Sequence, residues 1–157
     1  MRSIPSPGFP GDDGSAPQEV REALASYAVD TSRHAATLLV LQRARLLVPV
    51  VALPGEADGA GGAEMATVQM RGRDGRSALL AFTSTTSLTL WNQEARPVPV
   101  TAARAAQAAA QEGAVALLVD VAGPVKFVIE TPALLELARG SVLVRLSDGH
   151  GWARPIR

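Results

Sequence analysis

One acidic residue of this sequence stands where burial would change its chemistry. Asp120 ends an apolar run that begins at Ala116. A carboxyl group buried at the end of a strand has a raised pKa, and such a group suits acid or base catalysis. The structural alternative is that the carboxylate caps the turn at Gly123 through backbone amides. No second acid or histidine is close by in the sequence, and this favours the structural role.

Three arginines, Arg71, Arg73 and Arg76, surround a predicted turn at Asp74. Guanidinium groups bind phosphates and carboxylates through paired N–H donors, so this hairpin is a candidate site for an anionic ligand or an acidic partner. The alternative is a solvated turn whose charge is reduced by Asp74. Taken with Asp120, the three arginines define a candidate site for binding or converting a small molecule.

A second candidate site is an apolar surface around Trp91. Ser84 can cap a short helix that runs through Trp91, and Leu88 and Trp91 then share one face of that helix. A large ring on such a helix can anchor a partner protein, with Phe82 beside it. The alternative is that Phe82, Leu88 and Trp91 complete the core of the sheet.

Other chemistries lack the residues that they need. His34 and His150 are the only histidines, and neither has a carboxylate at the helical spacing of metal ligands, so we expect a surface helix position and a tail residue. The chain has no cysteine and no HExxH, GxSxG or GxxxxGK[ST] motif. The glycines between 55 and 62 lead into a strand and have acidic neighbours, which argues against a phosphate-binding loop. We therefore expect no metal, no cofactor and no catalytic residue.

Composition narrows the classes of partner and compartment. The 157 residues include 15 basic and 15 acidic side chains, so no overall field attracts nucleic acid. The N-terminus has no apolar segment typical of a signal peptide. The longest apolar run, 46–53, is too short to cross a bilayer and contains Pro49. These features predict a cytoplasmic protein with neither nucleic-acid binding nor membrane insertion.

The elements that position these residues follow from periodicity and turn chemistry. Residues 1–15 are rich in Pro, Gly, Ser and Asp and predict a disordered N-terminal arm, residues 16–146 predict a single domain, and residues 147–157 predict a C-terminal tail. Within the domain we expect helices, strands and two hairpins. The expected helices start near residues 17, 32, 84, 101 and 132, and the expected strands cover 45–53, 65–72, 77–83, 96–100, 116–121, 125–129 and 141–146.

These elements together predict an α/β (α+β) fold. The two hairpins and the strand at Arg45 form a mixed, largely antiparallel sheet, and amphipathic helices pack on it to make a two-layer sandwich. The sequence specifies no oligomeric state.

Several segments resemble one known family in order and spacing: 45–50, 74–76 ahead of 79–84, 96–99, and 118–120 near Gly123 and Pro124. This set is similar to the SseB N-terminal-domain family over roughly residues 20–140, and the resemblance implies a compact α/β domain. Because no catalytic constellation can be assembled, the leading hypothesis is a non-catalytic module that binds an unidentified protein partner.

Overall fold

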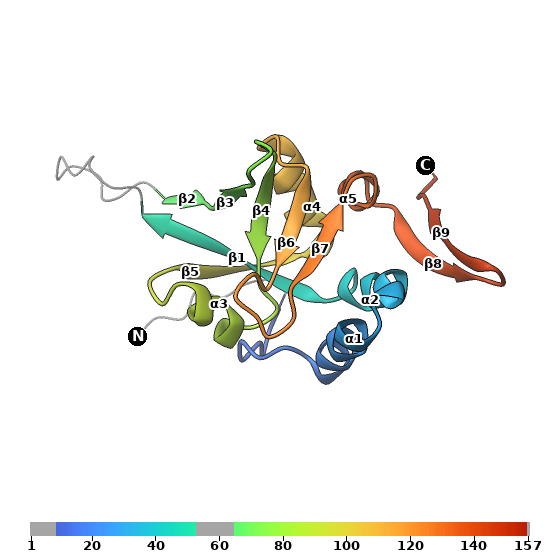
Figure 1. Cartoon of the computed structure of the whole chain (residues 1–157), viewed down its shortest axis with the longest axis horizontal. Coiled ribbons are helices and arrows are strands. Elements are labelled where there is room, and N and C mark those ends of the chain that lie inside the picture. Colours follow the sequence, from blue (N-terminus) through green and yellow to red (C-terminus); the bar gives the residue numbers. More distant parts are fainter. Residues whose placement is uncertain (1–8, 53–64, 157) are drawn as a thin grey trace.

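The computed structural model describes residues 9–52 and 65–156 (Figure 1). The elements follow in the order α1 (Gln18–Val29), η1 (Thr31–Arg33), α2 (His34–Leu41), β1 (Arg45–Ala52), β2 (Met65–Thr67), β3 (Gln69–Arg71), β4 (Ser77–Ala81), α3 (Thr85–Trp91), β5 (Arg96–Thr101), α4 (Ala102–Gln111), β6 (Ala116–Val119), β7 (Phe127–Glu130), α5 (Ala133–Ala138), β8 (Val142–Leu146) and β9 (Gly149–Ala153).

The strands of the described residues form three sheets. β1 lies between β2 and β5 with antiparallel pairing, and β8 pairs with β9 in an antiparallel hairpin. The central sheet has the order β3-β4-β6-β7, in which β4 and β6 are parallel and the other pairs are antiparallel. Two backbone hydrogen bonds of 2.7 and 2.8 Å between Leu47 and Phe82 join the β2-β1-β5 sheet to the central sheet. The predicted α+β class with a mixed sheet is confirmed.

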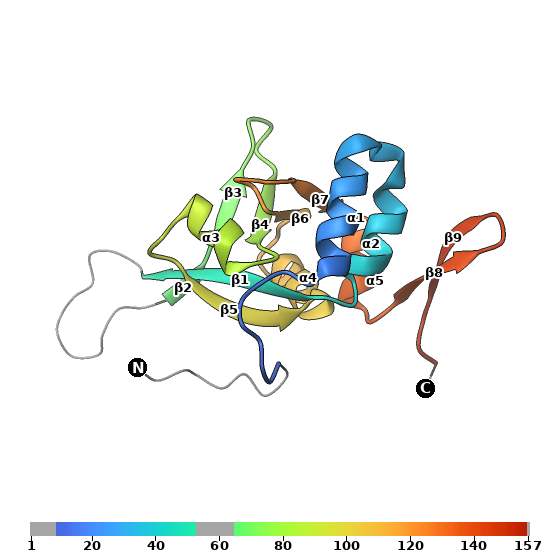
Figure 2. The same cartoon turned by 90° about the horizontal axis from the view of Figure 1, so that it is seen from below.

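The central sheet separates two apolar cores, because alternate residues of a strand point to opposite faces. Leu79 and Ala81 belong to the larger cluster, which includes residues of α1, α2, α4 and α5. Leu80 and Phe82 point the other way, into a smaller cluster with Leu88 of α3. Figure 2 shows α3 lying apart from the α1–α2 pair. The smaller cluster consists of Leu47, Leu80, Phe82, Leu88 and Ala95.

Local sequence signals account for several boundaries. The Ser84 side chain accepts a hydrogen bond from the Ser87 amide, and the Ser87 side chain accepts one from the Ser84 amide, which forms a capping box at the start of α3. Thr101 caps α4 by accepting from the Arg104 amide at 3.1 Å. Gly75 has φ +82°, a value that suits glycine in the turn between β3 and β4. The predicted hairpins and the extended segment at Arg96 are confirmed.

Three predicted boundaries differ in the structure. The single strand expected over 65–72 is divided at Val68: β2 pairs with β1, and β3 pairs with β4. The tail expected from residue 147 contains β9, which pairs with β8 and makes a hairpin that projects from the body (Figure 2). Within the arm expected over residues 1–15, residues 9–15 have defined contacts; the remainder of that arm, like the glycines between 55 and 62, lies outside the described residues.

Candidate functional site

The parallel pairing of β4 with β6 brings two polar segments together. Ala81 of β4 lies opposite Val119 of β6, so the residues that follow both strands meet at one edge of the sheet. The Asp120 amide donates to the Ala81 carbonyl at 3.0 Å. Thr83 and the capping residue Ser84 follow β4 at the same edge.

Asp120 is buried at this edge and bonds to Thr83. Its side chain accepts from the Thr83 amide at 2.9 Å and from the Thr83 hydroxyl at 2.7 Å. The residue is 1% exposed and has φ 54°, the left-handed region that side chains other than glycine seldom adopt. Burial raises the pKa of Asp120, while hydrogen bonds from Thr83 and Ser87 act in the opposite direction.

The sequence predicts that the Asp120 carboxylate caps the turn at Gly123, and this prediction is wrong. The Asp120 carbonyl, not its carboxylate, accepts from the Gly123 amide at 3.0 Å. The carboxylate points back to Thr83, 37 residues away in the sequence.

A cavity of about 450 Å³ adjoins Asp120. It lies between the first half of α1, the start of α3 and the loop after β6, and we call it the Asp120 cavity. Its lining combines hydroxyl groups, apolar side chains and one guanidinium group, that of Arg21, which donates to the Ala16 carbonyl at 2.9 Å. The lining residues are Ser15, Ala16, Arg21, Leu24, Ala25, Thr83, Ser84, Thr86, Ser87, Asp120, Pro124 and Val125.

Arg45 fixes the N-terminal wall of this cavity. Its guanidinium group contacts both carboxylate oxygens of Asp12, at 2.8 and 3.0 Å, and donates to the carbonyls of Ser15 and Thr83, each at 2.8 Å. The Thr85 amide donates to the Gly14 carbonyl at 2.8 Å. The prediction of disorder is wrong for residues 9–15. Asp12 and Ser15 both bond to the buried guanidinium group of Arg45, and the Gly14 carbonyl accepts from the Thr85 amide.

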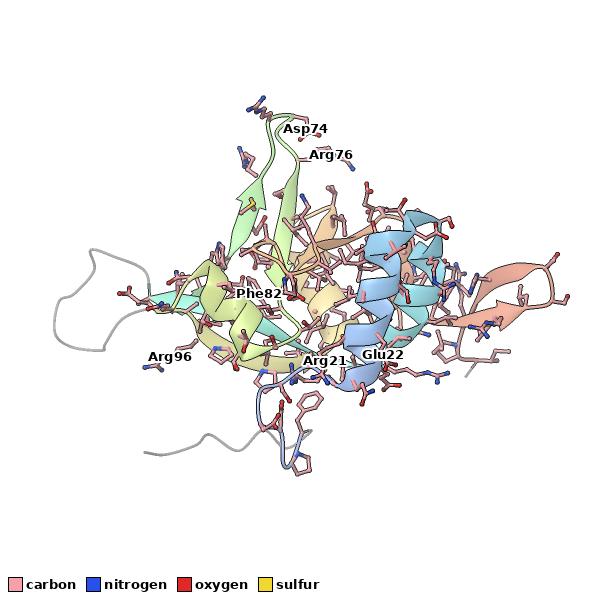
Figure 3. All side chains as sticks on the ribbon, turned by 60° about the horizontal axis from the view of Figure 1, so that its bottom comes forward. Arg21, Glu22, Asp74, Arg76, Phe82 and Arg96 are labelled. Carbon is pink, nitrogen blue, oxygen red and sulfur yellow. The ribbon has the colours of Figure 1, made fainter. Side chains whose placement is uncertain are left out.

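The structure does not bring Asp120 together with the hairpin arginines. Arg71 and Arg76 line a different hollow, over the central sheet, and Arg73 lines neither it nor the Asp120 cavity. In Figure 3, Arg76 lies near the tip of the hairpin, far from Arg21, which belongs to the lining of the Asp120 cavity. The predicted site that combined Asp120 with Arg71, Arg73 and Arg76 is therefore not formed.

The residues predicted around Trp91 divide between core and surface. Phe82 and Leu88 are 0% and 1% exposed, and Figure 3 shows Phe82 in the interior beside α3. Ser84 caps α3, so its hydroxyl already has partners. Trp91 is half-buried, and its ring centroid lies 5.7 Å from that of Phe82. Only Trp91 of this set presents a large side chain with part of its surface exposed.

His34 has a role that the sequence interpretation missed. Its Nε2 donates to the carbonyl of Val128 in β7 at 2.8 Å, and its ring stacks on Phe127 at 4.3 Å between centroids. The pairing of an α2 residue with β7 has no local sequence signal. Within the part of the chain that the structure describes, no group of three or more His, Asp or Glu is placed to hold a metal ion. None of the helices in this part is long and apolar enough to cross a membrane.

Comparison with known proteins identifies the family. Neither a curated protein nor a solved structure was found to match the chain. Residues 20–136 match the family described as SseB protein N-terminal domain, a span that covers more than half of the chain and includes the β4–β6 pair, α3 and Asp120. The protein therefore belongs to the SseB N-terminal domain family.

Proposed function

We propose that this domain is a non-catalytic protein-interaction module, which binds an apolar segment of a partner protein across one face of the central sheet. The observation that carries the proposal is a hollow of about 310 Å³ over this face, which we call the sheet hollow. It is lined by Met70, Arg71, Gly72, Asp74, Arg76, Ser77, Ala78, Val115, Ala116, Leu118, Val128 and Glu130.

The floor of the sheet hollow is mainly apolar. Met70, Ala78 and Ala116 lie side by side across β3, β4 and β6, and Leu118 and Val128 form the neighbouring row. Met70 is 39% exposed, and Ala78, Leu118 and Val128 are half-buried. Partly exposed apolar side chains grouped on one face are typical of interaction surfaces.

Trp91 adjoins this surface through a shared neighbour. Trp91 and Leu118 both pack against the smaller buried cluster, and Leu118 also lines the sheet hollow. The half-buried indole thus extends the apolar surface toward α3. A partly exposed aromatic ring beside an apolar surface can contribute strongly to the binding of a partner protein.

The positive charge of the β3–β4 hairpin favours a partner segment that carries acidic residues. The β3–β4 hairpin carries Arg71, Arg73 and Arg76 against one acid, Asp74, and all four are exposed. The Arg76–Asp74 ion pair is long, at 4.0 Å, and solvent-exposed, so it neutralises little. A partner segment with apolar side chains over the floor and carboxylates near the hairpin complements this surface.

Site-specific photo-crosslinking in cells tests the proposal. A photoreactive amino acid replaces Met70 in the sheet hollow and, as a matched control, Val29 at the end of α1, which is 89% exposed. We expect a discrete crosslinked partner from position 70 that is lost when Arg71→Glu and Arg76→Glu are added. The same crosslink should survive Arg33→Glu with Arg43→Glu, which are exposed on other elements. Equal crosslinking from positions 70 and 29, or a crosslink that both pairs of substitutions leave intact, contradicts the proposal.

A further inference from the structure

Within the part of the chain that the structure describes, Asp120 is a buried acid that takes part in no ion pair. Among the buried polar residues of segments 9–52 and 65–156 it is the only acidic one. Its hydrogen-bond donors, the amide and hydroxyl of Thr83 and the side chain of Ser87, are neutral. A buried carboxylate is costly unless a positive charge balances it, so Asp120 is suited to pair with a cation that enters from outside.

The Asp120 cavity has the size and lining of a small-molecule site. Its volume of about 450 Å³ falls within the roughly 300–1,000 Å³ of ligand sites. Leu24, Ala25 and Val125 supply apolar walls, and Ser84 and Thr86, which carry hydroxyl groups, also belong to the lining. A few polar groups in a mainly apolar cavity orient a ligand without binding it entirely through charge.

We propose that the Asp120 cavity binds a small organic amine, whose ammonium group pairs with Asp120 and whose apolar part lies against Leu24, Ala25 and Val125. The ammonium group has three donors, so it can bond to the carboxylate and to a hydroxyl group of the lining at the same time. Arg21 is the other charged residue of the lining, and its exposed side chain is held by the Ala16 carbonyl. An anion at Arg21 is the competing ligand class, which the experiment distinguishes.

This inference is independent of the proposed protein interaction. The Asp120 cavity and the sheet hollow have no lining residue in common. Amine binding is measured on the isolated full chain, whereas the crosslinking experiment needs a partner in cells. Failure of one experiment therefore leaves the other intact.

Nuclear magnetic resonance titration of the full chain tests the inference. The probes are n-butylammonium chloride, n-butanol and sodium butyrate, which share an alkyl chain and differ in charge. The reporter is the Thr83 amide, which donates directly to Asp120. We expect saturable shifts with butylammonium at concentrations at least about tenfold lower than with butanol or butyrate.

Asp120→Asn isolates the contribution of the charge. Asparagine tolerates the left-handed backbone at this position, and its side-chain oxygen can still accept from the Thr83 amide. We expect this variant to remain folded and to lose the preference for the ammonium probe over butanol. An unchanged preference overturns the inference, as does tighter binding of butyrate than of butylammonium.

Ala25→Phe tests the place of binding without changing Asp120. Ala25 is exposed on α1 and lines the cavity, so a phenyl group there fills the space. Ala28→Phe is the matched control, because Ala28 is exposed on the same helix and outside the lining. We expect Ala25→Phe alone to abolish the saturable shifts. Equal binding by both variants, or no saturable shift with butylammonium in wild type, overturns the inference.

Discussion

Burial at Asp120 links the candidate site to stability. The residue is 1% exposed and its pKa is raised mainly by desolvation, so the folded protein holds the proton more tightly than the unfolded chain does. A carboxyl group with a raised pKa in the folded state makes the free energy of unfolding depend on pH. This free energy falls as the pH rises from the pKa of the group in the unfolded chain, about 3.9, through its pKa in the folded protein. An ionised Asp120 therefore lowers the stability of the folded protein when no cation is bound beside it.

Asp120→Asn should remove this pH dependence. The asparagine keeps an oxygen that accepts from Thr83 but does not titrate. Measured by urea unfolding at a series of pH values, the variant should gain stability relative to wild type as pH rises through that window. The comparison is made between the two proteins at each pH, so other titrating groups largely cancel. A difference that stays constant with pH means that Asp120 titrates as in the unfolded chain.

At the scale of elements, the segment before α1 is held to the body by one buried cation. The Arg45 side chain is 8% exposed and that of Asp12 is 21% exposed, and two short contacts join them. Thr83 and Ser15 bind the same guanidinium group, so the segment, the end of β4 and the wall of the Asp120 cavity form one hydrogen-bonded unit.

Asp12→Ala should destabilise the protein by about 1–2 kcal/mol, because it removes charge-assisted hydrogen bonds from a mostly buried guanidinium group. Asp13→Ala is the matched control. The Asp13 side chain bonds only locally, to the amide and hydroxyl of Ser15, and is exposed. Thermal unfolding should show a lower Tm for Asp12→Ala and a nearly unchanged Tm for Asp13→Ala. If both variants melt like wild type, the Arg45 contacts do not stabilise the fold.

Sequence patterns predicted the elements better than the contacts between them. The capping residue Ser84 and the hairpin turn at Asp74 act within a few residues, and both were identified correctly. The bond from Thr83 to Asp120 depends on parallel pairing of β4 with β6, and the Arg45–Asp12 pair spans 33 residues. The periodicity of apolar residues does not indicate which distant segments of the chain come into contact. The predicted site with Asp120 beside the hairpin arginines failed for this reason.

At the scale of the whole molecule, the β8–β9 hairpin lies beyond the region that matches the family and projects from the body (Figure 2). A two-stranded hairpin is marginally stable alone. The side chain of Gln42 stabilises the hairpin by bonding to the backbone of Leu143 as a neighbouring strand would. Its side-chain amide donates to the Leu143 carbonyl at 2.7 Å and accepts from the Leu143 amide at 2.8 Å. Leu143 itself is buried in the larger cluster.

Gln42→Glu should loosen this hairpin selectively. A carboxylate can accept from the Leu143 amide but repels the Leu143 carbonyl, so one hydrogen bond is replaced by an unfavourable contact. Hydrogen exchange should become faster for amides of 142–153 and stay unchanged in β6. Gln93→Glu, at an exposed position, is the control for the added charge. Equal exchange in both variants would show that apolar packing alone holds the hairpin.

The bond from His34 to β7 has a consequence for how copies of the chain behave together. An outer strand offers backbone groups on which another chain can add a strand, the first step toward fibrils. β7 is an outer strand of the central sheet, and the imidazole occupies the Val128 carbonyl there. Because a carbonyl only accepts, Nε2 must carry the proton, and it does so in one neutral tautomer and in the imidazolium form alike. The ring thus takes one carbonyl of this outer strand out of reach of an added strand.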